Sequence, residues 1–472
     1  MQPSDDHQDA VTFSTPFLYT GMAFAGTPEF VDCADRGDTL QGPCRQLKVC
    51  VTARTTTRDI VNVHLDGTNF VEGEASDSSD LFQWLIDGVC NVVAADHIVY
   101  NVTRLREMGY TSPFVVSSVL HSKEPLALMT RGDDTSQFGD LVNWVLRALM
   151  TAEAKNITQE TAHLFPTTTV FGNHLEDLFV DAIAAVGNYG ELYSRAFGEA
   201  KPRSAMNTLY ILGGLNDVDN SGLMYSFPFG STELDLPEDI VPPGPVGNGT
   251  LEAIETRSLL RCGIVGGRPG FAEYSTSFAE WVGLDAEFCR GLGAALFTQE
   301  AEKFVAFVEY PNIAEAFLGL AHDEVDVLSG APFNMENDVK EPTTGLGFAF
   351  GPIYYYGDVV DDEGNNNNEA LTLALATRED DIQWSDFVRW TTMSTIYAEE
   401  EGITNASASE MPVVDLFGSS YRQAFRDVIL TVGHYGDIYN RNLESYIPRS
   451  HRNLLNQGDS PQLNPSWDFE SV

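Results

Sequence analysis

The sequence has few basic residues. Lys and Arg together number 27 against 69 Asp and Glu, which gives a formal net charge of −42 over 472 residues. Binding to nucleic acid and docking on an anionic membrane both need clustered Lys and Arg, so the composition argues against both. Such an excess of acid is typical of a highly soluble protein, or of a protein in a salty compartment.

Long apolar runs are also missing. No stretch of 18 or more apolar residues occurs, which argues against insertion into a membrane. The polar, acidic start at Met1–Asp6 resembles neither a signal peptide nor an Arg-rich transit peptide. We therefore expect a cytosolic chain or, as the preferred interpretation, a mature form whose targeting segment has been removed.

The sequence lacks the motifs of catalysis and of metal or cofactor binding. It has no G-x-S-x-G, no P-loop and no C-x-x-C. Four scattered histidines do not show the H-x-x-x-H spacing of a metal site; they are His121, His174, His322 and His434. We therefore predict no enzyme, no cofactor and no metal, although 43% hydrophobic residues are enough to build cores.

The sequence does contain an internal repeat. The segment 181–195, DAIAAVGNYGELYSR, recurs at 427–441 as DVILTVGHYGDIYNR, and Pro202-Arg203 recurs as Pro448-Arg449. The offset is 246 here and 247 further upstream, between Arg131 and Arg378. Chance does not keep an offset so constant over such a stretch, so we infer two similar copies of one module in tandem.

The two copies differ in their upstream parts. Phe17–Gly21 aligns with Ile353–Gly357, an offset of 336, so the first copy carries about 90 residues, roughly 25–122, that the second lacks. In the second copy an acidic, asparagine-rich interval at 358–368 takes their place and is predicted to form a loop. The expected organisation is a first repeat at 1–233, a Pro- and Gly-rich linker at 234–249, a second repeat at 250–456 and a tail at 457–472.

Hydrophobic periodicity predicts an α/β fold. Apolar residues at i, i+3, i+4 and i+7 predict helices at 134–153 and 384–401, and shorter helices are expected at 175–185 and 420–431. The expected strands include 11–25, 48–52, 91–95, 261–265, 303–310, 325–328, 348–356 and 371–377. Because strands and helices alternate, we expect two pseudo-repeated modules, each an open, mostly parallel sheet flanked by helices.

Four segments carry a resemblance to a known family. They are 250–263 (TLEAIETRSLLRCG), 281–290 (WVGLDAEFCR), 324–328 (EVDVL) and 184–191 (AAVGNYGE). These segments are similar to the periplasmic general amino-acid-binding protein of bacterial ABC transporters. The resemblance implies two α/β lobes that close on a ligand. Mapped onto it, the first copy keeps a lobe-two segment at about 25–122, and the second keeps a lobe-one segment at about 250–350.

The resemblance also implies one disulfide in each lobe. Cys50 and Cys90 fall where the family has its lobe-two disulfide, and Cys262 and Cys289 fall where it has one in lobe one. The alternative is that these residues are buried free thiols, which pack as small hydrophobic side chains. The choice depends on the compartment, and in a reducing plastid stroma we expect thiols.

The ligand site that the resemblance implies is incomplete. The family's carboxylate-binding arginine follows a strand of lobe one, and Gly330 stands at that place here. In the lobe-two segment, Thr55, Thr56 and Thr57 match the family's carboxylate-binding threonines, and Asp96 matches its ammonium-binding aspartate. The alternative is that these four residues only cap a strand end and a helix.

Two functions are open from the sequence. The first, which we expect, is a non-enzymatic structural protein that self-assembles through surfaces that the missing lobes would cover. The doubled module, the acidity and the run of four asparagines look like the protein shell around an algal pyrenoid, which supports CO2 fixation. That resemblance implies copies of itself and related shell proteins as partners, and the plastid stroma as location. The second is a solute-binding protein of an ABC transporter, periplasmic or secreted, which takes an amino acid or another small polar solute.

Overall fold

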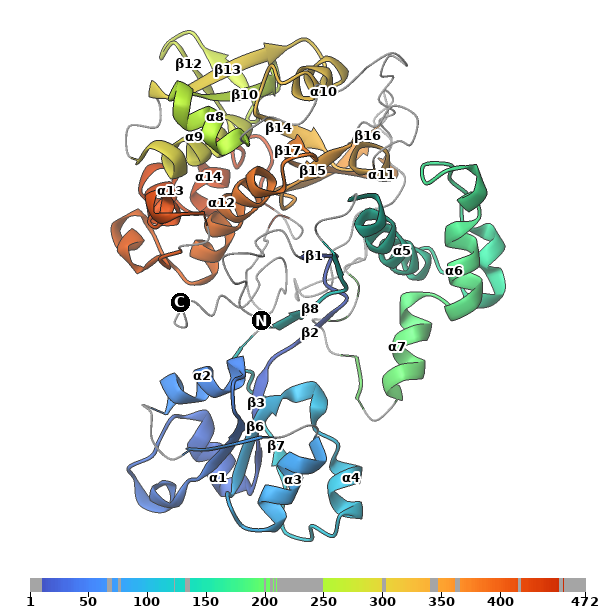
Figure 1. The fold of residues 1–472 in the computed structure, drawn as a ribbon, viewed down its shortest axis with the longest axis vertical. Helices are drawn as coiled ribbons and strands as arrows, with labels where there is room; N and C mark the ends of the chain where they lie inside the picture. Colours follow the sequence, from blue (N-terminus) through green and yellow to red (C-terminus); the bar gives the residue numbers. More distant parts are fainter. Residues whose placement is uncertain are drawn as a thin grey trace. The chain divides into compact units, whose positions relative to one another are not determined.

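The chain is seen here in a computed structural model, which describes most of its residues. They are 11–65, 70–74, 78–122, 124–131, 136–198, 201–203, 207, 209, 249–298, 303–339, 347–360, 366–414, 417–449 and 453. The chain divides into two compact units, which are described one at a time. The small unit is Leu18–Leu126, and the large unit is the rest of the described chain (Figure 1). No helix in the described part is long and apolar enough to cross a membrane.

The small unit is built on a five-stranded mixed sheet. Its strands are β3 (Met22–Gly26), β4 (Val49–Thr52), β5 (Phe70–Gly73), β6 (Val92–Asp96) and β7 (Val115–Val116). They lie in the order β5-β4-β6-β3-β7, and β4 pairs in parallel with β5 and β6. Strand β3 pairs antiparallel with β6 and β7. A separate ribbon joins β2 (Leu18–Thr20) to β8 (Glu124–Leu126).

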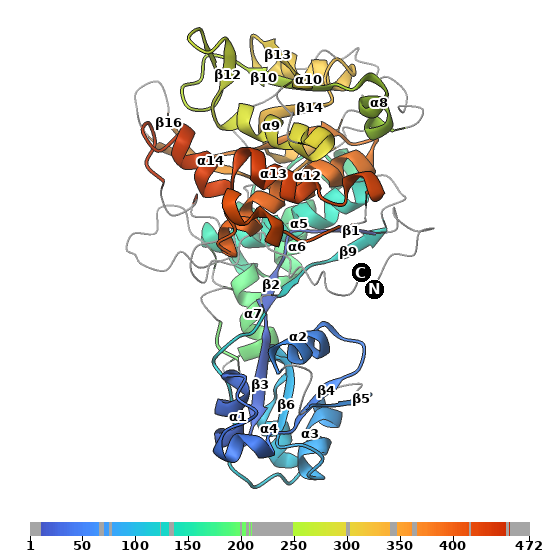
Figure 2. The ribbon, with the colours of Figure 1, turned by 90° about the vertical axis from the view of Figure 1, so that its left-hand side faces the viewer.

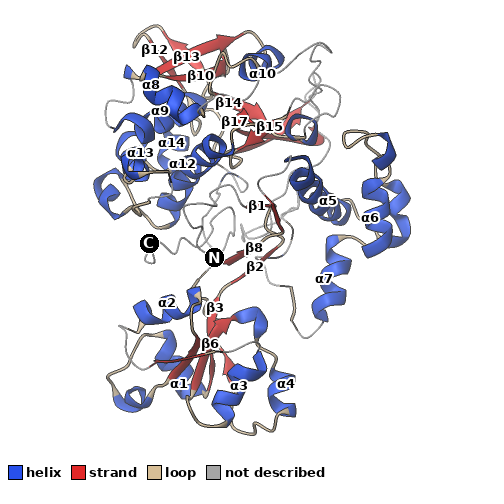
Figure 3. Ribbon diagram, in the orientation of Figure 1, coloured by secondary structure: helices blue, strands red, loops and turns tan. Residues whose placement is uncertain are grey.

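Helices cover both faces of this sheet (Figure 3). They are α1 (Pro28–Asp35), α2 (Thr56–His64), α3 (Ser78–Ile86) and α4 (Val102–Glu107). Side chains alternate between the faces along a strand, so Phe24 of β3 packs with Val31 of α1 and Val61 of α2. Its neighbour Ala25 belongs to the core on the other face, with Phe82 of α3. Burial on both faces explains why these strands are almost continuously apolar in sequence.

The large unit contains a six-stranded sheet. Its strands are β10 (Leu260–Val265), β13 (Val305–Tyr310), β14 (Val327–Pro332), β15 (Phe348–Phe350), β16 (Tyr355–Val360) and β17 (Asn366–Arg378). The order is β13-β10-β14-β17-β15, with β16 also paired to β17. Strand β10 is parallel to β13 and β14, whereas β17 is antiparallel to its neighbours. Two short ribbons join β1 (Val11–Phe13) to β9 (Met129–Arg131) and β11 (Glu273–Ser275) to β12 (Glu280–Val282).

Four helices of the large unit accompany this sheet: α8 (Thr250–Arg257), α9 (Leu284–Phe297), α10 (Ile313–Ala321) and α11 (Met335–Asp338). Phe317 of α10 packs into a buried cluster with Leu328 of β14 and Phe348 of β15. Helix α9 packs against β14 and against a helix from the C-terminal part of the chain, so it is enclosed between sheet and helices (Figure 2).

Two sets of three helices recur in the large unit. The first set is α5 (Ser136–Ala154), α6 (Leu178–Val186) and α7 (Tyr189–Phe197). The second set is α12 (Ile382–Glu400), α13 (Ala424–Val432) and α14 (Tyr435–Asn442). The middle helix of each set ends at a glycine with positive φ, 77° at Gly187 and 79° at Gly433. This backbone conformation favours glycine, so the glycine that both sequences place here ends the two helices in the same way.

In each helix set, an equivalent ion pair joins the first helix to the chain that follows the third helix. Arg203 Nη1 lies 2.5 Å from Glu153 Oε1, and Arg449 Nη1 lies 2.5 Å from Glu399 Oε1. In both sets the guanidinium lies over the first tyrosine of the third helix, at 4.7 and 4.8 Å from the ring centre. The equivalent residues are 246 apart, as the sequence repeat requires. The origin of the two modules as copies of each other stays a prediction.

The structure confirms the α/β fold class, but the expected mostly parallel sheets are wrong: β3 in the small unit and β17 in the large unit run antiparallel to their neighbours, so both sheets are mixed. Details of the secondary structure also differ. The long helices predicted at 134–153 and 384–401 lie at Ser136–Ala154 and Ile382–Glu400. The loop predicted at 358–368 is wrong in part, because its two ends belong to β16 and β17, which pair with each other. The backbone hydrogen bonds between these two consecutive strands do not depend on apolar side chains, so a polar sequence gave no sign of the pairing.

The run predicted as one strand at 11–25 forms three short strands, β1, β2 and β3. The division into units also separates Leu18–Leu126 from the helices α5 to α7, which lie in the large unit. The linker predicted at 234–249 and the tail at 457–472 lie outside the described residues, except for Gly249. The boundaries of the repeats themselves stay predictions.

Candidate ligand-binding site

Strand β14 of the large unit is bulged near its carboxyl end. Between Leu328 and Ala331 it carries one residue more than the facing part of β17, so Ser329 and Gly330 lie in a β-bulge. Gly330 has a φ of 72°, a left-handed conformation that glycine adopts at little cost. Ligands in open α/β sheets bind at the carboxyl ends of parallel strands, so this bulge lies in a favourable place for a site.

A buried carboxylate organises the residues around the bulge. Asp285, in the first turn of α9, has a fully buried side chain. Its Oδ1 accepts a hydrogen bond from Tyr354 Oη at 2.6 Å, and its Oδ2 accepts one from Arg268 Nη2 at 2.6 Å. The backbone N–H of Gly330 donates to Tyr354 Oη at 2.7 Å. Burial and then the charge of Asp285 hold the pKa of Tyr354 well above its usual value, so its hydroxyl stays a donor.

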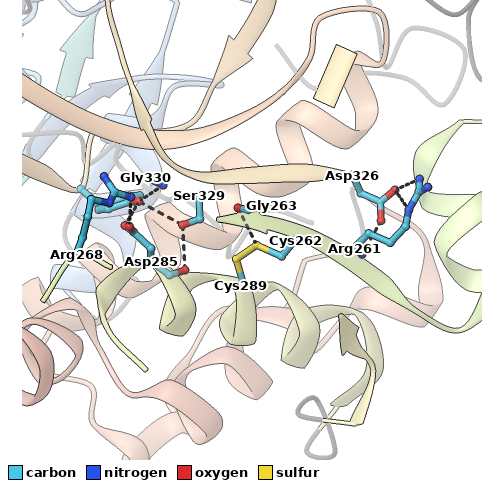
Figure 4. Close-up of a disulfide and its surroundings, with 10 residues drawn as sticks. Arg261, Cys262, Gly263, Arg268, Asp285, Cys289, Asp326, Ser329 and Gly330 are labelled. Carbon is cyan, nitrogen blue, oxygen red and sulfur yellow. Dashed lines mark hydrogen bonds and ion pairs between the residues drawn. A yellow bond between two sulfur atoms is a disulfide. The ribbon is translucent and has the colours of Figure 1, made fainter. Parts of the chain in front are cut away.

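Arg268 reaches this carboxylate from the loop that follows β10 (Figure 4). A Cβ atom built on Gly330 would lie 2.1 Å from Arg268 Nη2, so the guanidinium fills the space that a side chain at position 330 would need. The Nε atom of Arg268 is buried and has no hydrogen-bond partner in the part of the chain that the structure describes. Sequence reasoning missed Arg268, because its neighbourhood depends on the conformation of a glycine 62 residues away.

A disulfide ties together the two elements that support this cluster. Cys262 of β10 is bonded to Cys289 of α9, one turn beyond Asp285. Figure 4 shows the disulfide between the Arg268–Asp285 pair on one side and Asp326 with Arg261 on the other. The structure thus brings together the cysteine pair that the resemblance implied for the large unit, and fixes α9 against β10.

In the small unit, the predicted site residues lie at the ends of two paired parallel strands. Thr55, Thr56 and Thr57 follow β4 and begin α2, while Asp96 is the last residue of β6. The Thr55 hydroxyl accepts a hydrogen bond from Arg58 N at 3.3 Å and so caps α2, as the structural alternative expected. The Asp96 side chain makes no such cap, and burial raises its pKa. A ligand-binding role for these residues stays a prediction.

The small unit holds two disulfides. Cys50 of β4 is bonded to Cys90, as the resemblance implied, and Cys33 of α1 is bonded to Cys44. The Cys33–Cys44 disulfide was not predicted, because the resemblance implied no disulfide at these two positions. With all six cysteines paired, the structure contains no free thiol. We expected free thiols in a plastid, and the structure has disulfides instead. Disulfides are typical of oxidising compartments.

A second buried group of charged side chains lies where α5 meets α11, within the large unit. Trp144 Nε1 donates to Asp338 Oδ2 at 2.7 Å, and Arg147 lies over the Trp144 ring at 5.1 Å. Asp140 Oδ2 is buried without a partner among the described residues. Burial, with smaller contributions from Asp338 and Glu379, raises the pKa of Asp140 to about 10. No group of His, Cys, Asp or Glu in the described ranges is arranged to hold a metal ion.

Comparison with known proteins identifies a set of similar sequences. No model of a known protein family matches the chain. The general L-amino acid-binding periplasmic protein of Rhizobium johnstonii is 24% identical over 299 residues, covering 41% of this chain and 84% of its own length. An amino-acid ABC transporter-binding protein of Escherichia coli K12 is 32% identical over 113 residues, covering 23% of this chain. A glutamate/glutamine/aspartate/asparagine-binding protein of Rhodobacter capsulatus is 26% identical over 200 residues, covering 38% of this chain.

The chain spans 30% of the E. coli relative's length and 57% of the R. capsulatus relative's length. Among solved structures, a periplasmic binding protein of an ABC transporter from Brucella ovis, with glutathione bound, is 22% identical with a TM-score of 0.37. That likeness covers 47% of this chain and 73% of the other. An arginine-binding protein from T. maritima is 20% identical with a TM-score of 0.24, covering 33% and 63% of the two chains. The three curated relatives are named as amino-acid-binding proteins, and the R. johnstonii relative is named as periplasmic.

The interpretation as a self-assembling pyrenoid shell protein is wrong. The curated proteins that resemble the chain are named as amino-acid-binding proteins; the R. johnstonii protein is named as periplasmic and the E. coli protein as part of an ABC transporter. The predicted partners, which were further copies of the chain and related shell proteins, are corrected by the same finding. The plastid stroma likewise has no support from these relatives. Acidity and a repeated module are general properties, so they could not distinguish a shell from a binding protein.

Proposed function

We propose that this chain is a solute-binding protein that takes a small polar solute, with free amino acids as the first class to test. The partner in this proposal is the permease of an ABC transporter, and the location is the periplasm or the cell exterior. The observation that carries the proposal is the match to the R. johnstonii amino-acid-binding protein, because it extends over 84% of that protein's length. Three disulfides agree with an oxidising compartment.

The small unit supplies groups suited to an amino acid. Asp96 ends a strand with a side chain that is partly buried, and an ionised carboxylate there is a partner for an ammonium group. Thr56 is exposed and offers its hydroxyl, and the first turn of α2 offers backbone N–H groups, which suit an anionic group; the Thr57 side chain is buried. These groups support solute binding by this unit, and the side chains among them can be removed one at a time.

The test is a thermal-shift screen of the full chain against the twenty L-amino acids and glutathione. Binding should raise the melting temperature by several degrees at a ligand concentration about 100 times the dissociation constant. Asp96→Asn should abolish the shift, since it removes the charge that pairs with the ammonium group. The control is Asp87→Asn, which removes an exposed carboxylate of the same unit and should leave the shift intact.

The pH dependence provides a second readout of Asp96. Burial raises the pKa of Asp96, so its carboxylate becomes protonated at a higher pH than an exposed aspartate. The proposal requires the ionised form, and affinity should therefore fall as pH is lowered toward that raised pKa. A screen in which no amino acid shifts the melting temperature, or in which Asp96→Asn binds as well as the wild type, would contradict the proposal.

A further inference from the structure

A pocket of about 250 Å³ lies within the large unit, between the β11–β12 ribbon and β13, the strand at one end of the six-stranded sheet (Figure 1). We propose that this pocket binds a small, neutral aromatic molecule that carries an N–H or O–H group, of the class of indole and phenol. The inference goes beyond the proposed function, because the residues that line the pocket all belong to the large unit and include neither Asp96 nor Thr56.

Aromatic rings form much of the pocket wall. Tyr274 and Trp281 are paired directly across the β11–β12 ribbon, with ring centres 5.6 Å apart and an angle of 71° between the ring planes. Phe307 adds a further ring from β13. Tyr274 is 52% exposed, so part of its ring is open to contact. Because aromatic rings attract one another edge-to-face or in offset stacks, a flat ring is favoured in this pocket over an aliphatic group.

The turn of the ribbon adds a methyl group to this wall. Ala279 lines the pocket and has a φ of 57°, a left-handed conformation that is unfavourable for a residue with a Cβ atom. Glycine would adopt the same conformation at little cost. The strained backbone therefore comes together with apolar surface at the pocket and with the placement of the next residue, Glu280, beside it.

The charged side chains of the pocket are paired with each other. Arg290 of α9 lines the pocket with a side chain that is 10% exposed, and its guanidinium lies 5.7 Å from the ring centre of Phe307. Its Nη2 donates to the backbone oxygen of Trp281 and lies 3.5 Å from Glu280 Oε2. A carboxylate in the pocket would be repelled by Glu280, and an ammonium group would be repelled by Arg290. A ligand without net charge avoids both costs.

The carboxylate of Glu280 selects a ligand that has a hydrogen-bond donor. Its side chain is 44% exposed, and an ionised carboxylate has about four acceptor positions, of which the contact with Arg290 uses one. A ring N–H or O–H can donate to the remaining positions, and hydrogen bonds to a charged acceptor are stronger than those between neutral groups. Pockets for drug-sized molecules begin at about 300 Å³, so this pocket suits a smaller compound, such as a single or fused ring.

The test is calorimetric titration of the full chain with indole, N-methylindole, benzoate and benzylamine. The wild type should bind one indole with a dissociation constant on the order of 0.1–1 mM. N-methylindole, which lacks the N–H group, should bind about tenfold more weakly. The charged compounds, benzoate and benzylamine, should also bind more weakly than indole. No heat from indole at millimolar concentration, or tighter binding of either charged compound, would overturn the proposal.

The aromatic wall is tested by removing one ring. Tyr274→Ala should weaken the binding of indole by roughly tenfold, because the ligand loses an aromatic neighbour. The matched control is Phe278→Ala, which removes a ring of the same ribbon that is 75% exposed and does not line the pocket. Both rings are exposed, so both variants should fold, and the control should bind indole as the wild type does. An equal effect of the two substitutions would contradict binding at this pocket.

The role of Glu280 has its own variant. Glu280→Ala should bring indole and N-methylindole to within about twofold of each other in affinity. The control is Glu273→Ala, which removes an exposed carboxylate of the same ribbon and should keep the wild-type ratio. A ratio that Glu280→Ala leaves unchanged would overturn the selection of a donor. A chain that binds amino acids but not indole would overturn this inference alone, whereas a chain that binds indole but no amino acid would overturn the proposed function alone.

Discussion

The helix sets α5–α7 and α12–α14 are built from similar sequences but lie in different surroundings. Phe179 and Phe425 are equally buried at equivalent positions of α6 and α13, as are Ile183 and Ile429. Helix α13 packs against α9, whereas the main contacts of α6 are with α5 and with the short helix Gln159–Leu164. Contacts within a set thus follow the shared sequence, whereas contacts around a set depend on the neighbour that each copy has.

The opposite faces of the two middle helices differ accordingly. Val428 and Val432 of α13 are almost completely buried, and both would touch a Cβ placed on Gly291 of α9. The equivalent residues of α6, Ala182 and Val186, are only half-buried. Alanine in place of valine at position 182 reduces the apolar surface left in contact with water, so the sequence of α6 is adapted to the missing neighbour.

The largest expected difference is in the unfolding free energy lost when the arginine is removed from the equivalent ion pair of each helix set. Arg449 and Glu399 have side chains 7% and 9% exposed, while Arg203 and Glu153 are 19% and 25% exposed. Arg449→Ala leaves a buried carboxylate without its cation and should cost about 4 kcal/mol of unfolding free energy. Arg203→Ala should cost about 1–2 kcal/mol, because water reaches its partner. Urea unfolding measures both, and equal losses would remove the distinction between the sets.

The next effect concerns Asp140 of α5, whose buried carboxyl belongs to the charged group near α11. A carboxyl group with a pKa of about 10 in the fold stays protonated there while the unfolded chain ionises near pH 4. The fold therefore loses stability as pH rises between these values, by at most ~1.4 kcal/mol per unit. Asp140→Asn should reduce this pH dependence. Between pH 6 and pH 8 the wild type should lose about 2 kcal/mol more unfolding free energy than the variant loses.

The control for Asp140 is Asp386→Asn, at the equivalent position of α12, which should keep the wild-type slope. The groups around Asp140 that could also titrate are Asp338 and Glu379, whereas Arg147 stays charged at these pH values. Urea unfolding at pH 6, 7 and 8 supplies the measurement. Parallel slopes for Asp140→Asn and the wild type would show that Asp140 is ionised in the fold.

The smallest expected difference uses two valines at matched positions. Val432→Ala removes two methyl groups that pack near α9 and should cost about 2 kcal/mol. Val186→Ala removes the same atoms from a half-buried place and should cost less than about 1 kcal/mol. The same denaturation assay applies, and a larger loss at Val186 would mean that the outer face of α6 is covered by a neighbour.

The elements that sequence predicted well are those whose signal is local. The long helices of both sets were placed within a few residues, because apolar periodicity and the glycines that stop α6 and α13 act over one or two turns. Strands buried on both faces, such as β6, were found for the same reason. The pairing of β16 with β17 is local too, but it was missed because backbone hydrogen bonds hold it and the acidic, asparagine-rich composition of 358–368 is typical of a loop.

The candidate site divides in the same way. Thr55–Thr57 and Asp96 could be singled out, because they follow strands in sequence and matched a family pattern. Gly330 was interpreted only as the loss of an arginine. The guanidinium beside it comes from Arg268, on another loop, and its place depends on the bulge in β14 and on the carboxylate of Asp285. A single sequence does not reveal such a three-part arrangement.

The most direct test of the account is whether the chain binds an amino acid at all. Isothermal titration calorimetry of the full chain against the twenty L-amino acids measures this without labels. The account predicts that at least one binds at one molecule per chain, with a dissociation constant in the micromolar range or below. If none of the twenty gives a heat of binding at millimolar concentration, the chain is not an amino-acid-binding protein.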